Sequence, residues 1–444
     1  MPLTEDLHAL IQHTPFVDTH EHLLEESARI ALLERDSAPA YGSPGAFPAW
    51  PAPDFGWLFS QYAATDLLIA GMPRADLLKV HGWELSPKEK YRLLAPWYAR
   101  ARHTGVMQAA QTSLQLLFGA EDLREDNAER IADQFRTRIH PGYYRVLLND
   151  IANLEYTQVN CLHSPVFRET EQPELLAQDI SFVKLATELD VPAVSKLANR
   201  DVGSLKDWHE VIDWCFAEFG PRAIAVKNQS AYVRALDYAR VTAEEAAPLF
   251  ARYLRKPEVL SPAEHKAIQD HLFHYCIEKA TEYGLPVKLH TGYYADENKM
   301  PLHRLRRNAG DVAELLLAHP KTTFVIMHID WPYDAETTAL AKHFNNAYVD
   351  MCWIWVVNPL AGVRWLKEFL VTAPSNKVLT FGGDYLAVES VPGHAALARK
   401  GIAQVFGELL RDGWLHEHEV ESLAARIMHG NAHELFDERR VARG

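Results

Sequence analysis

The sequence is poor in several features that would mark particular classes of protein. Its 444 residues include only four cysteines and no CxxC pair, which argues against a zinc knuckle or a disulfide framework and fits a reducing cytoplasm. No stretch reaches the roughly 18 uninterrupted apolar residues of a membrane span. The first residues, MPLTEDLHALIQ, lack the basic and apolar regions of a secretion signal. We therefore expect a cytoplasmic protein with no membrane partner.

Basic residues are too few for a nucleic-acid-binding surface. Lys and Arg total 45 against 59 Asp and Glu, a formal net charge of −14, and no block of one sign stands out. We expect a small-molecule substrate and no nucleic acid, and a homo-oligomer, as is common among large soluble enzymes. The chain does have 22 histidines, which prompts a search for metal ligands.

Short apolar runs alternate with amphipathic stretches over most of the chain. This alternation predicts βαβ units with a parallel sheet, and eight runs suit a (β/α)8 TIM barrel, an α/β fold. A doubly wound sheet would favour a glycine-rich loop after its first strand, but DTHEHLLEE contains no glycine. The predicted strands are FVDTHEH (16–22), TQVNCL (157–162), VPAVSKL (191–197), RAIAVKN (222–228), LPVKLH (285–290), TTFVIMH (322–328), NAYVDMC (346–352) and KVLTFGGD (377–384).

One long segment departs from this alternation. Residues 24–150 show helical patterning and no strand of comparable quality, so we predict a large helical insertion after strand 1. The barrel with its C-terminal helices would then comprise residues 1–23 and 151–444.

Polar side chains recur where the predicted strands end. Because the active site of a barrel forms at the carboxyl ends of its strands, residues there are candidates for function. Alternation along strand 1 puts Asp18, His20 and His22 on the inner face and turns Glu21 away from it. The later strand ends supply Lys227, His290, His328 and Asp384. Imidazole and carboxylate are ligands of zinc and similar ions, so the set predicts a metal centre.

Other residues are candidates for contact with the substrate. Lys288 alternates with His290 and should face inward, where it would meet either a carboxylate of the substrate or a barrel carboxylate such as Asp18. Arg234 follows strand 4. Trp331 and Trp353 lie at or just beyond strands 6 and 7, where they would either wall the pocket or pack under the loops.

The ordered set of strand-end residues resembles the amidohydrolase superfamily. RIMHGNAHELF (426–436) is similar to the closing helix of that family. The long helical insertion looks like the branch that holds uronate-isomerase-like enzymes and the amidohydrolase domains fused to glutamine synthetase.

The resemblance implies a ligand set. His20, His22 and Asp384 would bind one ion. With two ions, Lys227 would be carboxylated and bridge them while His290 and His328 bind the second. With a single ion, which we favour, His290 joins the first set and Lys227 is free to meet an anionic substrate. We expect zinc, with manganese or another divalent ion as the alternative.

From these roles we predict a metal-dependent hydrolase of an amide, lactone or related carbonyl bond in a small, carboxylate-bearing molecule. Asp384 would carry the proton from the metal-activated water to the leaving group, and His328 would stabilise the oxyanion. Three alternatives stay open: a non-oxidative decarboxylase, a uronate-like sugar-acid isomerase, and a barrel that binds metal or ligand without catalysis.

Overall fold

The strands of the chain form one parallel barrel. The computed structural model describes residues 2–34 and 50–441; residues 1, 35–49 and 442–444 of the predicted barrel and insertion lie outside the described residues. The strands are β1 (Phe16–Glu21), β2 (Leu154–Val159), β3 (Leu176–Gln178), β4 (Ile180–Ser181), β5 (Val226–Asn228), β6 (Val287–Leu289), β7 (Phe324–Met327), β8 (Ala347–Asp350) and β9 (Val378–Leu379).

Two junctions complete the circle of strands. The strands pair in parallel in the order β1-β2-β3 and β4 through β9. Only Asp179 separates β3 from β4, and its N–H donates to the Val159 carbonyl at 2.8 Å, so the two are one strand between β2 and β5. On the other side, Thr19 N donates to Phe381 O at 3.0 Å and Asp384 N to His20 O at 2.9 Å. The second junction joins β1 to the chain after β9, which closes an eight-stranded barrel.

The third strand is not where the sequence predicts it. VPAVSKL (191–197) is helical and falls in α10 (Val191–Ala198), whose buried positions Val191, Val194 and Ala198 follow helical spacing. The Asp190 side chain caps this helix by accepting from Ala193 N at 3.2 Å. The third strand is instead the short run that contains β3 and β4.

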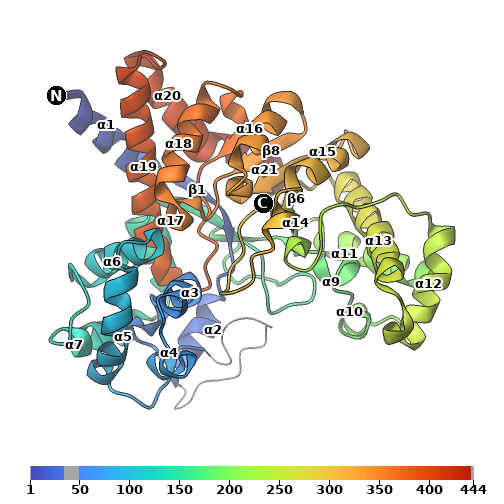
Figure 1. The fold of residues 1–444 in the computed structure, drawn as a ribbon, viewed down its shortest axis with the longest axis horizontal. Helices are drawn as coiled ribbons and strands as arrows, with labels where there is room; N and C mark the ends of the chain where they lie inside the picture. The colour runs from blue at the N-terminus through green and yellow to red at the C-terminus, as the bar shows by residue number, and fades with distance from the viewer. Residues whose placement is uncertain (1, 35–49, 442–444) are drawn as a thin grey trace.

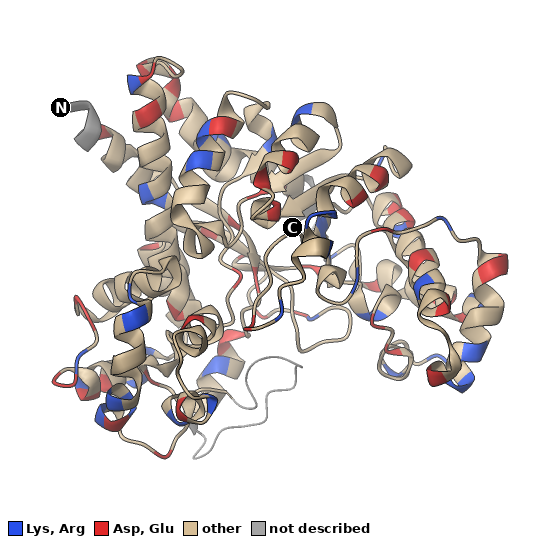
Figure 2. Cartoon of the chain, in the orientation of Figure 1, with Lys and Arg blue, Asp and Glu red and all other residues tan. Residues whose placement is uncertain are grey.

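Helices surround the barrel on its outer side, and α11–α13 gather at the opposite side from α3–α7 (Figure 1). None of the described helices is long and apolar enough to cross a membrane. Acidic and basic residues are interspersed along these helices (Figure 2). The helices after α10 include α11 (Leu205–Phe219), α12 (Ala243–Arg255), α13 (Pro262–Glu282), α15 (Asn308–Ala318), α16 (Asp334–His343), α18 (Pro359–Leu370), α19 (Val391–Arg411), the short α20 (Val420–Ala425) and α21 (Asn431–Val441).

The described chain between β1 and β2 consists of helices and their connecting loops and contains no strand. It packs on the barrel rather than standing apart: Gly393 of α19 has no room for a side chain because Ala109 and Ser113 of α6 lie directly against it. A buried ion pair at 2.9 Å joins Arg29 to Glu389. The helices are α2 (Glu26–Ala31), α3 (Gln61–Ile69), α4 (Arg74–His81), α5 (Pro87–Ala101), α6 (Gly105–Phe118), α7 (Ala128–Arg138) and α8 (Tyr143–Arg145).

The amino-terminal end of the barrel is closed by an apolar plug. Phe436 of α21 is fully buried there, and Ala432 from the same helix joins it. The strands contribute Val17, Tyr156, Ala177, Val325 and Leu379 to this cluster. One end of the barrel is therefore sealed by hydrophobic packing, and the other remains for a site.

Candidate metal centre and its pocket

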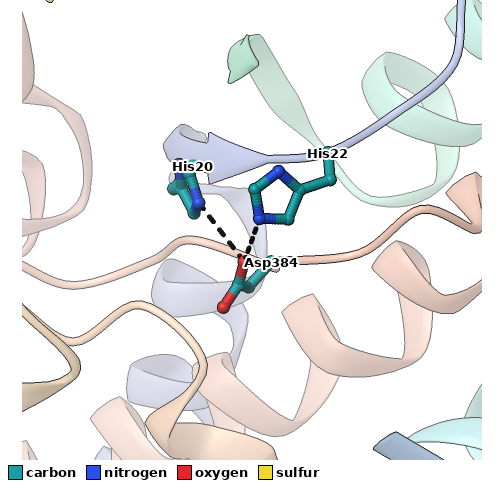
Figure 3. Close-up of side chains that lie close together, drawn as sticks. All are labelled: His20, His22 and Asp384. Atoms are coloured by element: carbon teal, nitrogen blue, oxygen red, sulfur yellow. Dashed lines mark ion pairs between the residues drawn. The ribbon is translucent and has the colours of Figure 1, made fainter. Parts of the chain in front are cut away.

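Three metal-ligating side chains converge at the carboxyl end of the barrel. His20 and His22 come from the end of β1, and Asp384 lies just beyond β9 (Figure 3). Asp384 Oδ1 is 3.3 Å from His20 Nε2 and 3.0 Å from His22 Nε2. All three residues are buried. The junction between β1 and the chain after β9 therefore also brings His20 and His22 next to Asp384.

The donor set suits a divalent cation. His22 Nδ1 lies 2.7 Å from the Asn160 carbonyl, an N–H donation that leaves Nε2 for a metal, and the buried Nδ1 of His20 forms no hydrogen bond within the described chain. Burial lowers the pKa of His20 well below its usual value. Burial alone would raise the pKa of Asp384, but the two imidazoles beside it hold that pKa well below its usual range. Two neutral imidazoles and one carboxylate are the ligands that zinc and similar ions take.

His290 and His328 form a second pair next to this triad. His328 Nε2 is 2.9 Å from His290 Nδ1, and the outer nitrogens of the pair lie 3.0 Å from the Cys352 and Tyr293 carbonyls. Burial lowers the pKa of His328 to about 4, and burial together with the neighbouring His328 lowers that of His290 well below its usual value. The two rings therefore stay neutral and share two N–H protons among these three contacts. His328 Nε2 is 4.0 Å from Asp384 Oδ2, and ligation of an ion by His290 or His328 stays a prediction.

Several site residues have a backbone conformation that side chains rarely adopt. Asp384 has φ 65°, His328 φ 64° and Trp353 φ 71°, and Ile329 and Asp330 continue the left-handed run after His328. Each such residue costs about 1–3 kcal/mol, which the surrounding packing must offset. This strain lies at strand ends, and at His328 and Asp384 it positions the side chains of the two candidate site residues.

A carboxyl pair lies beneath the triad. Burial raises the pKa of Asp18 to about 7, and burial with the neighbouring Asp18 charge raises that of Glu21 well above its usual value. The alternation that turned Glu21 away from the site is wrong, because irregular pairing of β1 with β2 breaks the two-residue period after Asp18. The Glu21 carboxylate instead accepts a hydrogen bond from Tyr385 N and contacts Gly383 beside Asp384.

The triad opens into a cavity of about 480 Å³. His22, Asp384, His290 and Lys227 reach its lining. The Lys227 ammonium is buried, and its one hydrogen bond in the described chain goes to Met327 Sδ at 2.6 Å. Burial lowers the pKa of Lys227 to about 8, while the Asp384 charge opposes that shift. A lysine without a carboxylate at hydrogen-bond distance therefore lies beside the candidate ligands.

The other four predicted substrate contacts do not line this cavity. Lys288 is buried in the barrel and pairs with Asp179 at 2.8 Å, so its partner is a barrel carboxylate, although not Asp18. Arg234 binds Asp270 and Gln269 instead.

Both predicted tryptophans pack behind the site. The Trp353 ring lies 4.3 Å from that of Tyr62 and 5.5 Å from His328, and Trp331 stacks edge-on against Tyr293 at 5.1 Å. Their contribution is aromatic packing under the loops.

The pattern of strand ends also missed residues from the helical segment. Tyr62 of α3 lines the cavity and donates its hydroxyl hydrogen to the Asp384 carbonyl at 2.6 Å. Gln61 lines it too and accepts from Leu386 N at 2.8 Å. Only the helical patterning of α3 is visible in the sequence, and that pattern does not show which face reaches the site.

The sequence matches a known protein family and a curated protein. A family model described as amidohydrolase matches residues 184–437. The protein fluG of Emericella nidulans is 24% identical over 227 residues, which is 49% of this chain and 26% of that protein. The matched region therefore spans about a quarter of the length of this curated relative.

Solved structures share the fold over the full length. A uronate isomerase from Thermotoga maritima superimposes with a TM-score of 0.74 at 16% identity, covering 98% of this chain and 97% of that one. A glucuronate isomerase from Caulobacter crescentus gives a TM-score of 0.75 at 16% identity, covering 98% and 94%. The (β/α)8 barrel prediction is confirmed, and the helical segment after β1 lies within the shared architecture.

Proposed function

This chain belongs to the amidohydrolase family, and from that membership we propose that it is a metal-dependent enzyme that isomerises a small sugar acid in the cavity beside His22 and Lys227. The observation that carries the proposal is the pairing of a convergent ligand triad with a buried lysine that no carboxylate neutralises. A buried ammonium is costly unless an anion meets it. A carboxylate-bearing substrate would supply that anion next to the metal ligands.

Each residue of the site would have a separate role in such a reaction. His20, His22 and Asp384 would hold the ion, which would polarise the carbonyl group and the neighbouring hydroxyl group of the substrate. Aldose–ketose isomerisation moves one proton between adjacent carbons and one between their oxygens. His290 and Asp384 both line the cavity and are the groups positioned to carry these protons. Lys227 would bind and orient the carboxylate of the substrate.

Two likenesses support isomerisation above other reactions of the family. Both structural neighbours described above are uronate or glucuronate isomerases by name, and each covers 98% of this chain, including its helical segment. Hydrolysis is the second candidate. The amidohydrolase description of the matching family favours it, with Asp384 carrying the proton from water to the leaving group.

Product mass separates the reactions. We suggest incubating the zinc- or manganese-loaded full chain with uronates, N-acyl amino acids and sugar lactones in D₂O, followed by NMR and mass spectrometry. Isomerisation of a uronate would retain its carbon and oxygen atoms and replace one carbon-bound hydrogen with solvent deuterium. Hydrolysis products would replace the proposal by its second candidate, and carbon dioxide would indicate the decarboxylase. No conversion of any uronate, with the metal bound, would overturn isomerisation.

Lys227 offers a direct test of the substrate class. Lys227→Met should raise KM for the acid about 10- to 100-fold, because a charge-assisted contact of roughly 1.5–3 kcal/mol is lost. Lys206→Met, at a side chain that is 85% exposed, is the matched control and should leave KM unchanged. An unchanged KM in Lys227→Met would remove the lysine from substrate binding. Zinc as the native ion, the homo-oligomer and the cytoplasmic location stay predictions.

A further inference from the structure

A second group of metal-ligating side chains lies on the outside of the barrel, near its amino-terminal end. Glu155 is the second residue of β2, while His429 in η10 (Arg426–Gly430) and His433 in α21 are one helical turn apart. His433 Nε2 is 2.6 Å from Glu155 Oε2, and His429 Nδ1 is 3.6 Å from Glu155 Oε1. One atom from each residue lies within 4.8 Å of the others.

One histidine of this group is already oriented and the other has an unsatisfied nitrogen. His433 Nδ1 donates to Asp437 Oδ2 at 2.6 Å, an arrangement that directs Nε2 toward Glu155. His429 Nδ1 is buried, forms no hydrogen bond within the described chain, and faces the same carboxylate. A buried nitrogen left without a partner is uncommon unless a water or an ion completes it.

We propose that Glu155, His429 and His433 form a second divalent-cation site of the zinc type, with Asp437 as the positioning residue for His433. Ligands at tetrahedral zinc lie about 3.3 Å apart for bonds near 2.0–2.1 Å, a value between the separations present here. The side chains are 24–33% exposed, so an ion can enter from solvent. Water would complete the coordination.

The chemistry of the donors selects the ion. Two imidazoles and one carboxylate match zinc or a neighbouring transition ion better than calcium or magnesium, which prefer oxygen ligands alone. The competing arrangement is a side-chain network in which His433 bridges Glu155 and Asp437 directly, with no place for an ion.

The position of the site gives it a role in holding the fold. An ion there would join β2 to α21, the helix whose Phe436 plugs the barrel. Binding to the folded state alone stabilises that state as the ion concentration exceeds its dissociation constant. An ion at this site would therefore hold α21, and with it Phe436, against β2. This role is separate from that of the metal centre at the carboxyl end of the barrel.

A two-by-two set of full-length variants tests this site independently of the proposed function. His429→Gln with His433→Gln removes the outer ligands, and His20→Ala with His22→Ala removes the central ones. After equilibration with micromolar zinc and dialysis, zinc content is measured and circular dichroism confirms the fold. The outer double variant should lose about one equivalent in both the wild-type and the central-variant backgrounds.

The control removes two other surface histidines from the same region. His416 and His418 are exposed and stack at 5.8 Å, and His416→Gln with His418→Gln should retain the wild-type zinc content. In the central-variant background, zinc should also raise Tm, and the rise should vanish when His429 and His433 are replaced. Equal zinc content with and without the outer pair, or a variant that folds yet keeps the zinc-dependent Tm rise, would overturn the site. Loss of zinc from the central variants alone would overturn this inference and leave the proposed function standing.

Discussion

The two ends of the barrel are built from the same strands but are filled by opposite kinds of side chain. At the carboxyl end, buried polar groups converge on a cavity: His20, His22 and Asp384 at the rim, and the Asp18–Glu21 pair beneath them. At the amino end, Phe436 of α21 fills the interior among apolar side chains from the strand starts. The first arrangement costs desolvation and backbone strain, and the second supplies hydrophobic burial that can offset them.

The difference teaches where each kind of substitution should act. A change at the carboxyl end should alter turnover more than stability, because the groups there are strained and poorly compensated without an ion. A change in the plug should alter stability more than turnover, because the described apolar cluster around Phe436 includes none of the residues that line the cavity.

The largest effect should come from the carboxylate of the triad. Asp384→Asn retains the shape of the side chain but removes its charge, so kcat should fall by about 10²–10⁴-fold with little change in Tm. The measurements are kcat on the substrate found in the screen, metal content, and thermal unfolding.

Asp126→Asn is the control for this charge removal, because Asp126 is 79% exposed, pairs with Arg124 and does not line the cavity. It should behave as wild type. A kcat near wild type in Asp384→Asn would remove this residue from the chemistry and erase the contrast between the two ends.

The carboxyl end was predictable from sequence where strand geometry governs it. His20, His22 and Asp384 follow apolar runs, and a parallel barrel brings the ends of all its strands to one face. The third strand was not predictable, because Asp179 interrupts it, while VPAVSKL offers a longer apolar run that also has helical spacing. Local apolar content therefore favoured the wrong segment.

Two further misses have separate causes. Glu21 joins Asp18 because the pairing of β1 with β2 is irregular, and such a bulge depends on the neighbouring strand rather than on the local pattern. Tyr62 reaches Asp384 through tertiary packing of α3, which no spacing within the helix encodes.

The plug should give the second largest effect. Phe436→Ala leaves a cavity at the amino end and should lower the free energy of unfolding by about 3–5 kcal/mol, measured by urea denaturation. Leu360→Ala is the control, since Leu360 is 75% exposed and should change that free energy by less than about 0.5 kcal/mol. The folded Phe436→Ala protein should retain its central metal and its kcat. A large loss of kcat with unchanged stability would show that the two ends are coupled.

The smallest effect should come from the hydroxyl group that joins the helical segment to the triad. Burial raises the pKa of Tyr62 well above its usual value, so its hydroxyl stays a donor to the Asp384 carbonyl at any working pH. Tyr62→Phe removes one hydrogen bond worth about 1 kcal/mol, and kcat should fall roughly 5-fold because Asp384 is held less firmly. Tyr98→Phe is a matched control in the same helical segment, since its hydroxyl donates to Asp122 at 2.8 Å and does not line the cavity. Both variants should lose similar stability, but only Tyr62→Phe should lose turnover.

Equal kcat in the two variants would mean that α3 supports the fold without positioning the Asp384 carboxylate. The geometry of the carboxyl end would then depend on the strands alone.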